Sequence, residues 1–179
     1  MELPMPERAL GPWLFGKLPA LGDFVSRGLD NAARTRLDNW LSREMEDARV
    51  KAGDQFDSLY DCAPAWNFVD CDEAGQWNGG ALCASQDRAG RRFPLIMATP
   101  ADDAAAAAAL SAGCLSAMCQ AFASGWDADS LSDAVVAPES ANWQPTAPEW
   151  VLLTDDGPAM VLPGRFPPGA IAAMVEVAQ

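Results

Sequence analysis

The stretch LFGKLPALGDF, residues 14–24, places two glycines, a lysine and an acid close together, and such residue types build phosphate-binding loops. A nucleotide-binding P-loop needs its second glycine followed by Lys and then Ser or Thr, so that backbone amides and the ammonium group reach the phosphates together. Here Lys17 follows the first glycine, and Gly22 is followed by Asp23, whose charge would repel a phosphate. The dinucleotide fingerprint is also missing, because the stretch contains no G-x-G. We therefore expect neither kind of phosphate loop.

Three groups of acidic residues could hold a metal ion or act as an acid and a base. They are Asp70 with Asp72 and Glu73, Asp102 with Asp103, and Asp155 with Asp156. A calcium loop needs a longer, regular spacing of oxygen ligands with a glycine inside it, which the first group lacks. The second pair falls in the first turn of an expected helix, where the dipole favours negative charge, and the third falls in an expected turn. We interpret all three as surface acids, with a metal-assisted phosphohydrolase built on them as the alternative enzyme hypothesis.

The other common catalytic side chains give no constellation. The chain has 179 residues and no histidine, so it lacks the commonest general base, the usual metal ligand and the Ser-His and Cys-His pairs of hydrolases. No serine stands in a G-x-S-x-G elbow. Cys83 and Cys114 fall in apolar patterns, where small buried hydrophobes are expected. We therefore expect no catalytic residues, no metal site and no cofactor, and a protein that is not an enzyme.

The charge and the cysteine content limit the possible partners and the cellular compartment. The chain carries 12 basic and 25 acidic residues, a net charge of −13, which would repel nucleic acid and anionic membranes. No apolar run is expected to cross a membrane, and the opening MELPMPERAL lacks the basic start and apolar core of a leader. Five cysteines without a C-x-x-C pair favour reduced thiols. We expect an acidic cytoplasmic protein without direct membrane insertion, whose oligomeric state stays open.

Residues 29–50 are expected to form an amphipathic helix. Its apolar residues recur at the spacing of one helical face, and Asp30 or Asn31 is suited to be the N-cap. Charged residues such as Arg36 fall away from this face, so we interpret them as a solvated face.

A second helix is expected after Thr99, as N-cap, with Pro100 at the first helical position and Asp102 reaching back. Gly125 is a fitting C-terminal stop. The alanine run in its first half is interpreted as a helical turn packed close to a neighbour. A short apolar helix over residues 169–178 ends the domain.

Strands are expected at residues 66–69, 81–85, 93–98, 150–154 and 159–162. Gly90 can adopt the positive φ that the turn before the third strand requires, while Pro94 suggests that this strand lies at a sheet edge or is irregular at its start. Residues 155–157 are a hairpin turn, and residues 137–148, with three prolines, are an irregular connector anchored by Trp143. This order favours one α/β domain over residues 1–179, with a mainly antiparallel sheet covered by helices.

Five of the seven tryptophans stand at element ends or in amphipathic patterns: Trp13, Trp40, Trp66, Trp77 and Trp150. Core packing is the expected role. An aromatic surface patch for a partner is the alternative.

Two loops, residues 16–23 and 87–92, combine glycines with unlike charges. Asp23 could pair with Arg91 or Arg92. A structural ion pair that links the loops is one interpretation, and a groove that recognises another protein is the other.

The same loops carry a family resemblance. FGKLPALGDFVSRGL, APAWNF and QWNGGALCASQDRAGRRFPLIMA occur in this order, and together they resemble the TagF family of type VI secretion-associated proteins. The closing VLPGRFPPGAIAAMV is similar to the family's C-terminal piece, so the likeness covers nearly the whole chain. The chain departs from the family pattern at Gln86, where a valine is usual, and at residues 150–153, where many members carry Ser-Leu-Trp-Trp. Either departure could alter the choice of partner.

The resemblance implies a three-layer αβα sandwich around a central mixed, largely antiparallel sheet, in a single TagF-like domain. It also implies a non-enzymatic bacterial negative regulator, which restrains type VI secretion post-translationally by sequestering the forkhead-associated scaffold protein, independently of threonine phosphorylation. A structural accessory subunit of the secretion apparatus is a further alternative. The surface that binds the partner and the signal that relieves repression stay open. The motif positions proposed to bind the partner are Phe15, Gly16, Lys17, Pro19, Gly22, Asp23, Phe24, Asp87, Arg88, Gly90, Arg91, Phe93 and Pro94.

Overall fold

The computed structural model describes residues 11–179. The first ten residues, including the stretch considered for a leader, lie outside the described part. The strands are β1 (Trp13–Lys17), β2 (Phe24–Arg27), β3 (Trp66–Cys71), β4 (Trp77–Cys83), β5 (Leu95–Ala101), β6 (Glu149–Thr154) and β7 (Gly157–Pro163). The helices are α1 (Asn31–Ala52), the 3-10 turn η1 (Gly53–Gln55), α2 (Phe56–Asp61), α3 (Ala104–Ser124), α4 (Ala128–Ser132) and α5 (Ala170–Val177).

The seven strands form one open sheet in the order β2-β1-β5-β4-β3-β6-β7. Every pairing between these strands is antiparallel. The α/β class with antiparallel neighbours is therefore confirmed, and the expected mixed character of the sheet is wrong. Four of the six pairings join strands that a hairpin or a loop without a helix connects, namely β1 to β2, β3 to β4, β4 to β5 and β6 to β7, and such connections reverse the chain direction.

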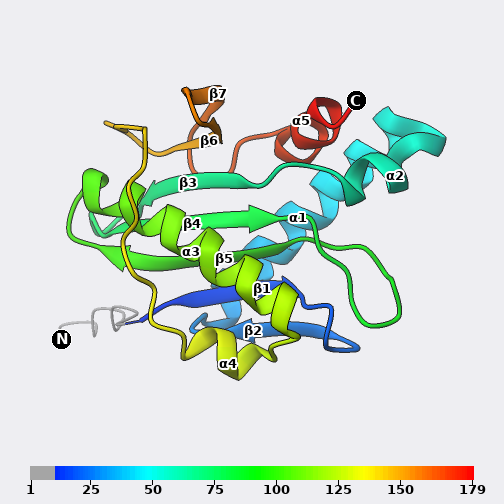
Figure 1. Ribbon diagram of the computed structural model, residues 1–179, viewed down its shortest axis with the longest axis horizontal. Coiled ribbons are helices and arrows are strands. Elements are labelled where there is room, and N and C mark those ends of the chain that lie inside the picture. Colours follow the sequence, from blue (N-terminus) through cyan, green and yellow to red (C-terminus); the bar gives the residue numbers. More distant parts are fainter. Residues whose placement is uncertain (1–10) are drawn as a thin grey trace, which may run out of the picture.

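Both faces of the sheet are covered by helices (Figure 1). Because side chains alternate along a strand, Phe15 and Ile96 point to the face where α1 and α5 pack. Leu14 and Met97, one residue away on the same strands, point to the opposite face, where α3 packs. In Figure 1, α3 lies in front of the sheet and α1 behind it. The two faces therefore hold separate apolar clusters.

Helix α3 approaches the sheet closely because glycine and alanine meet there. A Cβ added to Gly79 on β4 would lie 1.9 Å from the Ala107 carbonyl oxygen, and the Cys114 thiol donates to the Gly79 carbonyl oxygen at 3.5 Å. The interpretation of the alanine run as a closely packed turn is confirmed.

The same helix corrects the expectation that no apolar run could cross a membrane. Helix α3 has 21 residues and is apolar enough to do so by length and composition alone. Core helices meet the same criteria, and α3 packs against β3, β4 and β5.

Three expected start points are wrong because sheet pairing outweighs local signals. Thr99 and Pro100 do not start α3 but continue β5, opposite Gly79 and Asn78 of β4, and Asp103 is the N-cap instead. Strand β4 also begins earlier than expected, at Trp77, and β5 begins after Pro94. Strand β5 lies inside the sheet, so the edge position inferred from that proline is wrong.

The predicted helix ends and turns that strand pairing does not affect are confirmed. Asp30 caps α1 by accepting a hydrogen bond from the Ala33 amide. Gly125 ends α3 in the left-handed region, and Gly90 has a φ of 81°. The last hairpin turns at residues 155–156, and Trp143 is buried in the connector as expected.

The contact between α3 and β4 generates a stability prediction. Gly79→Ala should lower the free energy of unfolding by about 2 kcal/mol, because the new methyl group overpacks the interface with Ala107. Gly11→Ala is the control, since nothing lies within 4 Å of a Cβ there, and it should change stability by less than about 0.5 kcal/mol. Urea unfolding of the two variants checks this, and equal midpoints would contradict the close approach.

Candidate functional site

The two glycine-bearing loops lie side by side at one end of the sheet. One joins β1 to β2 and the other joins β4 to β5. The Arg88 amide donates to the Leu21 carbonyl oxygen at 2.7 Å, and the Ser85 hydroxyl donates to the Lys17 carbonyl oxygen at 2.7 Å. We call residues 17–24 and 85–94 together the loop junction.

A buried ion pair forms the centre of the loop junction. The Lys17 Nζ lies 3.0 Å from Asp87 Oδ2, and their side chains are 8% and 0% exposed. Asp87 also accepts hydrogen bonds from the Ala89 and Arg91 amides, both at 3.0 Å, and from Arg91 Nε at 2.7 Å. Lys17 donates in addition to the Arg91 carbonyl oxygen at 3.3 Å. Four donors thus surround one carboxylate.

These contacts lower the pKa of Asp87. Burial by itself raises the pKa of a carboxyl group. Here hydrogen bonds from the Arg91 amide, from Lys17 and from the Arg91 side chain outweigh burial, and the charge of Lys17 adds to them. The pKa of Asp87 therefore lies well below its usual range, and the carboxylate stays charged.

The expected pair between Asp23 and an arginine is wrong. Asp23 Oδ1 instead accepts from the Phe24 amide at 2.8 Å. Arg91 reaches the other loop through the Gly22 carbonyl oxygen, at 2.7 Å. Arg92 pairs with Asp61 through two 2.7 Å hydrogen bonds. The loops are linked by an ion pair as one interpretation required, but Lys17 and Asp87 form it, because the exposed Asp23 turns back onto its own backbone.

Three aromatic rings close the junction beside this pair. Phe24 packs edge-on against Phe93 with ring centroids 4.8 Å apart, and Phe15 lies 6.0 Å from Phe24. Gly16 has a φ of 134°, and a Cβ there would lie 2.0 Å from the Pro94 carbonyl oxygen. Only glycine fits at this crossing of β1 and the start of β5.

The expected motif residues therefore divide into two sets. Buried in the junction are Lys17, Asp87, Phe93 and Pro94, and Phe15 and Gly16 are buried beside it on β1. Exposed are Gly22, Asp23, Phe24, Arg88, Gly90 and Arg91, with Pro19 half-buried. The structure brings both sets together in one place, and only the exposed set can touch a partner directly.

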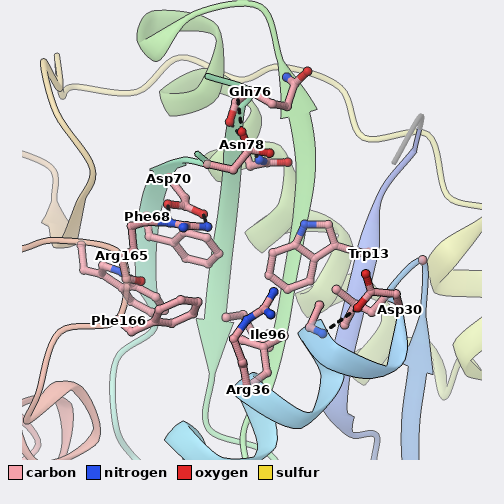
Figure 2. Close-up of a pocket in the computed structure, with 16 residues that line it drawn as sticks. Trp13, Asp30, Arg36, Phe68, Asp70, Gln76, Asn78, Ile96, Arg165 and Phe166 are labelled. Carbon is pink, nitrogen blue, oxygen red and sulfur yellow. Dashed lines mark hydrogen bonds and ion pairs between the residues drawn. The ribbon is translucent and has the colours of Figure 1, made fainter. Parts of the chain in front are cut away.

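A cavity lies at the other end of β1, on the face of the sheet that α1 covers (Figure 2). Its volume is about 460 Å³. Phe68 and Trp150 stack with centroids 4.3 Å apart, and Trp13 lies 6.5 Å from Phe68. The first turns of α1 form one wall, and Arg165 and Phe166 form another. We call it the α1 cavity.

The charged groups of the α1 cavity are almost all engaged. Arg165 donates to both oxygens of Asp70, at 2.6 and 3.0 Å, and these hydrogen bonds raise the pKa of Arg165. Asp30 caps α1, and Asp72 accepts from two amides of its own loop. Arg36 is the exception, because it forms no ion pair with any residue in 11–179.

Sequence reasoning missed the α1 cavity. Its assignment of Arg36 to a solvated face is confirmed, because Arg36 is exposed. It assigned Trp13 to the core and gave no role to Arg165 and Phe166. The pair of Arg165 with Asp70 spans 95 residues, so no local pattern announces it.

The remaining candidate groups have structural roles. Asp103 caps α3, and residues 155–156 form the turn between β6 and β7. Within residues 11–179, no three His, Cys, Asp or Glu side chains gather as they would around a metal ion. Burial raises the pKa of Cys114 to about 12, and it also raises that of Cys83. The interpretation of these two cysteines as buried hydrophobes is confirmed.

The two departures from the family pattern differ in position. Trp150, Val151 and Leu152 are buried, so that departure lies mainly in the core. Gln86 is exposed at the loop junction and borders a smaller cavity with Pro19. Gln86 is therefore the one exposed residue among them, while Leu153 is half-buried.

Comparisons with known proteins place the chain among relatives. The sequence model of the family described as "TagF N-terminal domain, Type VI secretion system-associated" matches residues 13–137. Among solved structures, the chain is similar to the crystal structure of PA0076 from Pseudomonas aeruginosa PAO1. The two share 23% sequence identity and a TM-score of 0.55, over 94% of this chain and 78% of that chain. At this identity the likeness concerns the fold. No curated protein matches the chain significantly.

The buried pair predicts a large stability effect. Lys17→Met should lower the free energy of unfolding by about 3 kcal/mol, because it leaves the buried Asp87 carboxylate without its nearest cation. Asp23→Ala is the control, since its side chain is exposed, and it should change stability by less than about 0.5 kcal/mol. Urea unfolding followed by tryptophan fluorescence checks this, and a Lys17→Met midpoint at the wild-type value would refute the role of the pair.

The lowered pKa of Asp87 predicts a pH dependence. A carboxylate with a depressed pKa in the folded state contributes stability above its unfolded pKa of about 3.9, and this contribution is lost as the pH falls toward the folded value. The free energy of unfolding of wild type should therefore exceed that of Asp87→Asn by a constant amount at pH 5–7. In a series with steps of ~0.5 pH units, this difference should become smaller at each step below about pH 4. Urea unfolding across this series measures the difference. A difference that stays constant down to about pH 3 would contradict the assignment.

Proposed function

The chain belongs to the family of TagF N-terminal domains, which are type VI secretion system-associated, and on this premise we propose that it is a non-enzymatic negative regulator of type VI secretion. It acts post-translationally, by binding and sequestering the forkhead-associated scaffold protein that activates assembly. The observation that carries this proposal is the family match over residues 13–137. The loop junction, which contains the family's motif positions, is the proposed contact surface.

The geometry of the loop junction supports a binding role. The exposed Asp23, Phe24 and Arg88 project from a backbone that the buried pair and the Arg88-to-Leu21 hydrogen bond fix in place. A preordered surface loses little conformational entropy when a partner binds. Phe24 is 46% exposed, which is the kind of aromatic anchor that interfaces favour.

The remaining features of the proposal concern the fold and the compartment. Helices on both faces of the sheet support the three-layer αβα sandwich that the family resemblance implies. Five unpaired cysteines support a reducing, cytoplasmic compartment. The net charge of −13 favours a partner with neutral or basic surface over nucleic acid.

The proposal predicts which surface charges matter. Asp23→Arg combined with Arg88→Glu should reduce recovery of the scaffold protein in co-purification by about tenfold, because two interface charges are reversed on an intact frame. Arg43→Glu with Glu46→Arg on the exposed face of α1 is the matched control, and it should retain wild-type recovery. Both double variants keep the net charge of the chain.

The outcomes separate the surface from the function. If the folded junction variant recovers as much scaffold protein as wild type, the loop junction is not part of the interface. If wild type recovers no scaffold protein, the proposed partner is wrong. Deleting the gene should switch secretion on without raising transcript levels, and secretion that stays off would refute the regulatory role. Hydrolysis of a phosphate ester with magnesium or manganese would instead support the enzyme alternative.

A further inference from the structure

We propose that the α1 cavity is a binding site for a small planar organic anion, whose acid group pairs with Arg36 and whose ring packs against the open side of Trp13. This goes beyond the proposed regulatory function, since the α1 cavity and the loop junction lie at opposite ends of β1. The proposal depends on the shape of the cavity, on its aromatic walls and on its one unengaged charge.

The α1 cavity has the size and lining of a small-molecule site. Its volume of about 460 Å³ falls in the range of pockets that hold small ligands. Figure 2 shows an open space with Trp13 on one side and Phe68 and Phe166 on the other. Trp13 is half-buried and Phe166 is 41% exposed, so their rings are open to a guest. A flat apolar ring that is open to the cavity suits a planar ligand.

The sign of the ligand's charge follows from which groups are engaged. Among the cavity's carboxylates, Asp70 holds Arg165, Asp30 holds the Ala33 amide at 2.7 Å, and Asp72 holds two amides at 2.9 and 2.8 Å. Arg36 projects from α1 toward the space between Phe68 and Trp13 (Figure 2). Of the cavity's two cations, Arg36 is the one without an ion pair among residues 11–179, and it is exposed. Asp30 and Asp72 have no cationic partner there either, and backbone amides hold them. A planar guanidinium matches a carboxylate or phosphate group.

An unpaired donor lies next to the cavity wall, outside the cavity lining. Trp40 packs 5.3 Å from Trp150 and 5.4 Å from Phe166, and both of these rings line the α1 cavity. In the described part of the chain, Trp40 Nε1 is the single buried side-chain nitrogen or oxygen without a hydrogen-bond partner. Buried donors are nearly always satisfied.

Two dyes that share their rings but differ in charge test the proposal on the full chain. Anilinonaphthalene sulfonate is an aromatic anion, and phenylnaphthylamine is its neutral counterpart. The anionic dye should bind wild type with one-to-one stoichiometry, measured by dye fluorescence and by quenching of the tryptophans. Arg36→Ala should weaken it by about tenfold, as expected for a lost charge-assisted hydrogen bond. The neutral dye should bind both proteins equally.

Two further variants serve as controls. Arg34→Ala removes the same charge from a neighbouring exposed position of α1 outside the cavity lining, and it should leave both affinities unchanged. Ala33→Leu places a larger side chain on the cavity wall and should weaken both dyes, while circular dichroism verifies the fold. Equal affinity of wild type and Arg36→Ala for the anionic dye would overturn the proposal, as would an equal loss in Arg34→Ala.

Competition then distinguishes the source of the acid group. Indole-acetic acid carries a carboxylate and adenosine monophosphate carries a phosphate, each on a planar ring. Displacement of the anionic dye by either compound, lost in Arg36→Ala, supports the proposal and names the class of acid. Failure of both to displace the dye at millimolar concentration would contradict it.

Discussion

A buried ion pair between two loops is the constraint on which the rest of the site depends. Lys17 ends β1 and Asp87 lies in the connection between β4 and β5. A charge taken out of water is strongly unfavourable unless a partner compensates it. If either loop moved away, one of the two charges would therefore stay buried without its partner or become exposed to water. Gly16 adds a steric condition, because only a residue without a Cβ lets β1 pass the Pro94 carbonyl oxygen.

Because of this constraint, the family's motif residues have two different roles, one structural and one at the surface. Those that most define the pattern, including Lys17, Asp87 and Phe93, lie inside the loop junction and contact one another or its backbone. Their exposed neighbours, Asp23 and Arg88, are the residues available to another molecule. The buried motif residues thus fix the conformation of the two loops. Recognition of a partner depends on the exposed side chains of the same motif.

Sequence reasoning succeeded where structure is decided locally and failed where it is decided by distant strands or side chains. The N-cap at Asp30 and the stop at Gly125 depend on a few neighbouring residues, and both were predicted. Thr99 has the local chemistry of a cap, yet pairing with β4 keeps it in a strand. The α1 cavity depends on Arg165 meeting Asp70 across 95 residues, and no spacing rule reaches that far.

Amide hydrogen exchange of the free protein tests the central constraint most directly. The amides of Ala89 and Arg91 lie in a surface connection, yet both donate to the buried Asp87 carboxylate at 3.0 Å. They should exchange as slowly as amides in the interior of β5, and this protection should collapse in a folded Lys17→Met variant. Exchange in the wild type at the rate of an open turn would contradict a loop junction held by the buried pair.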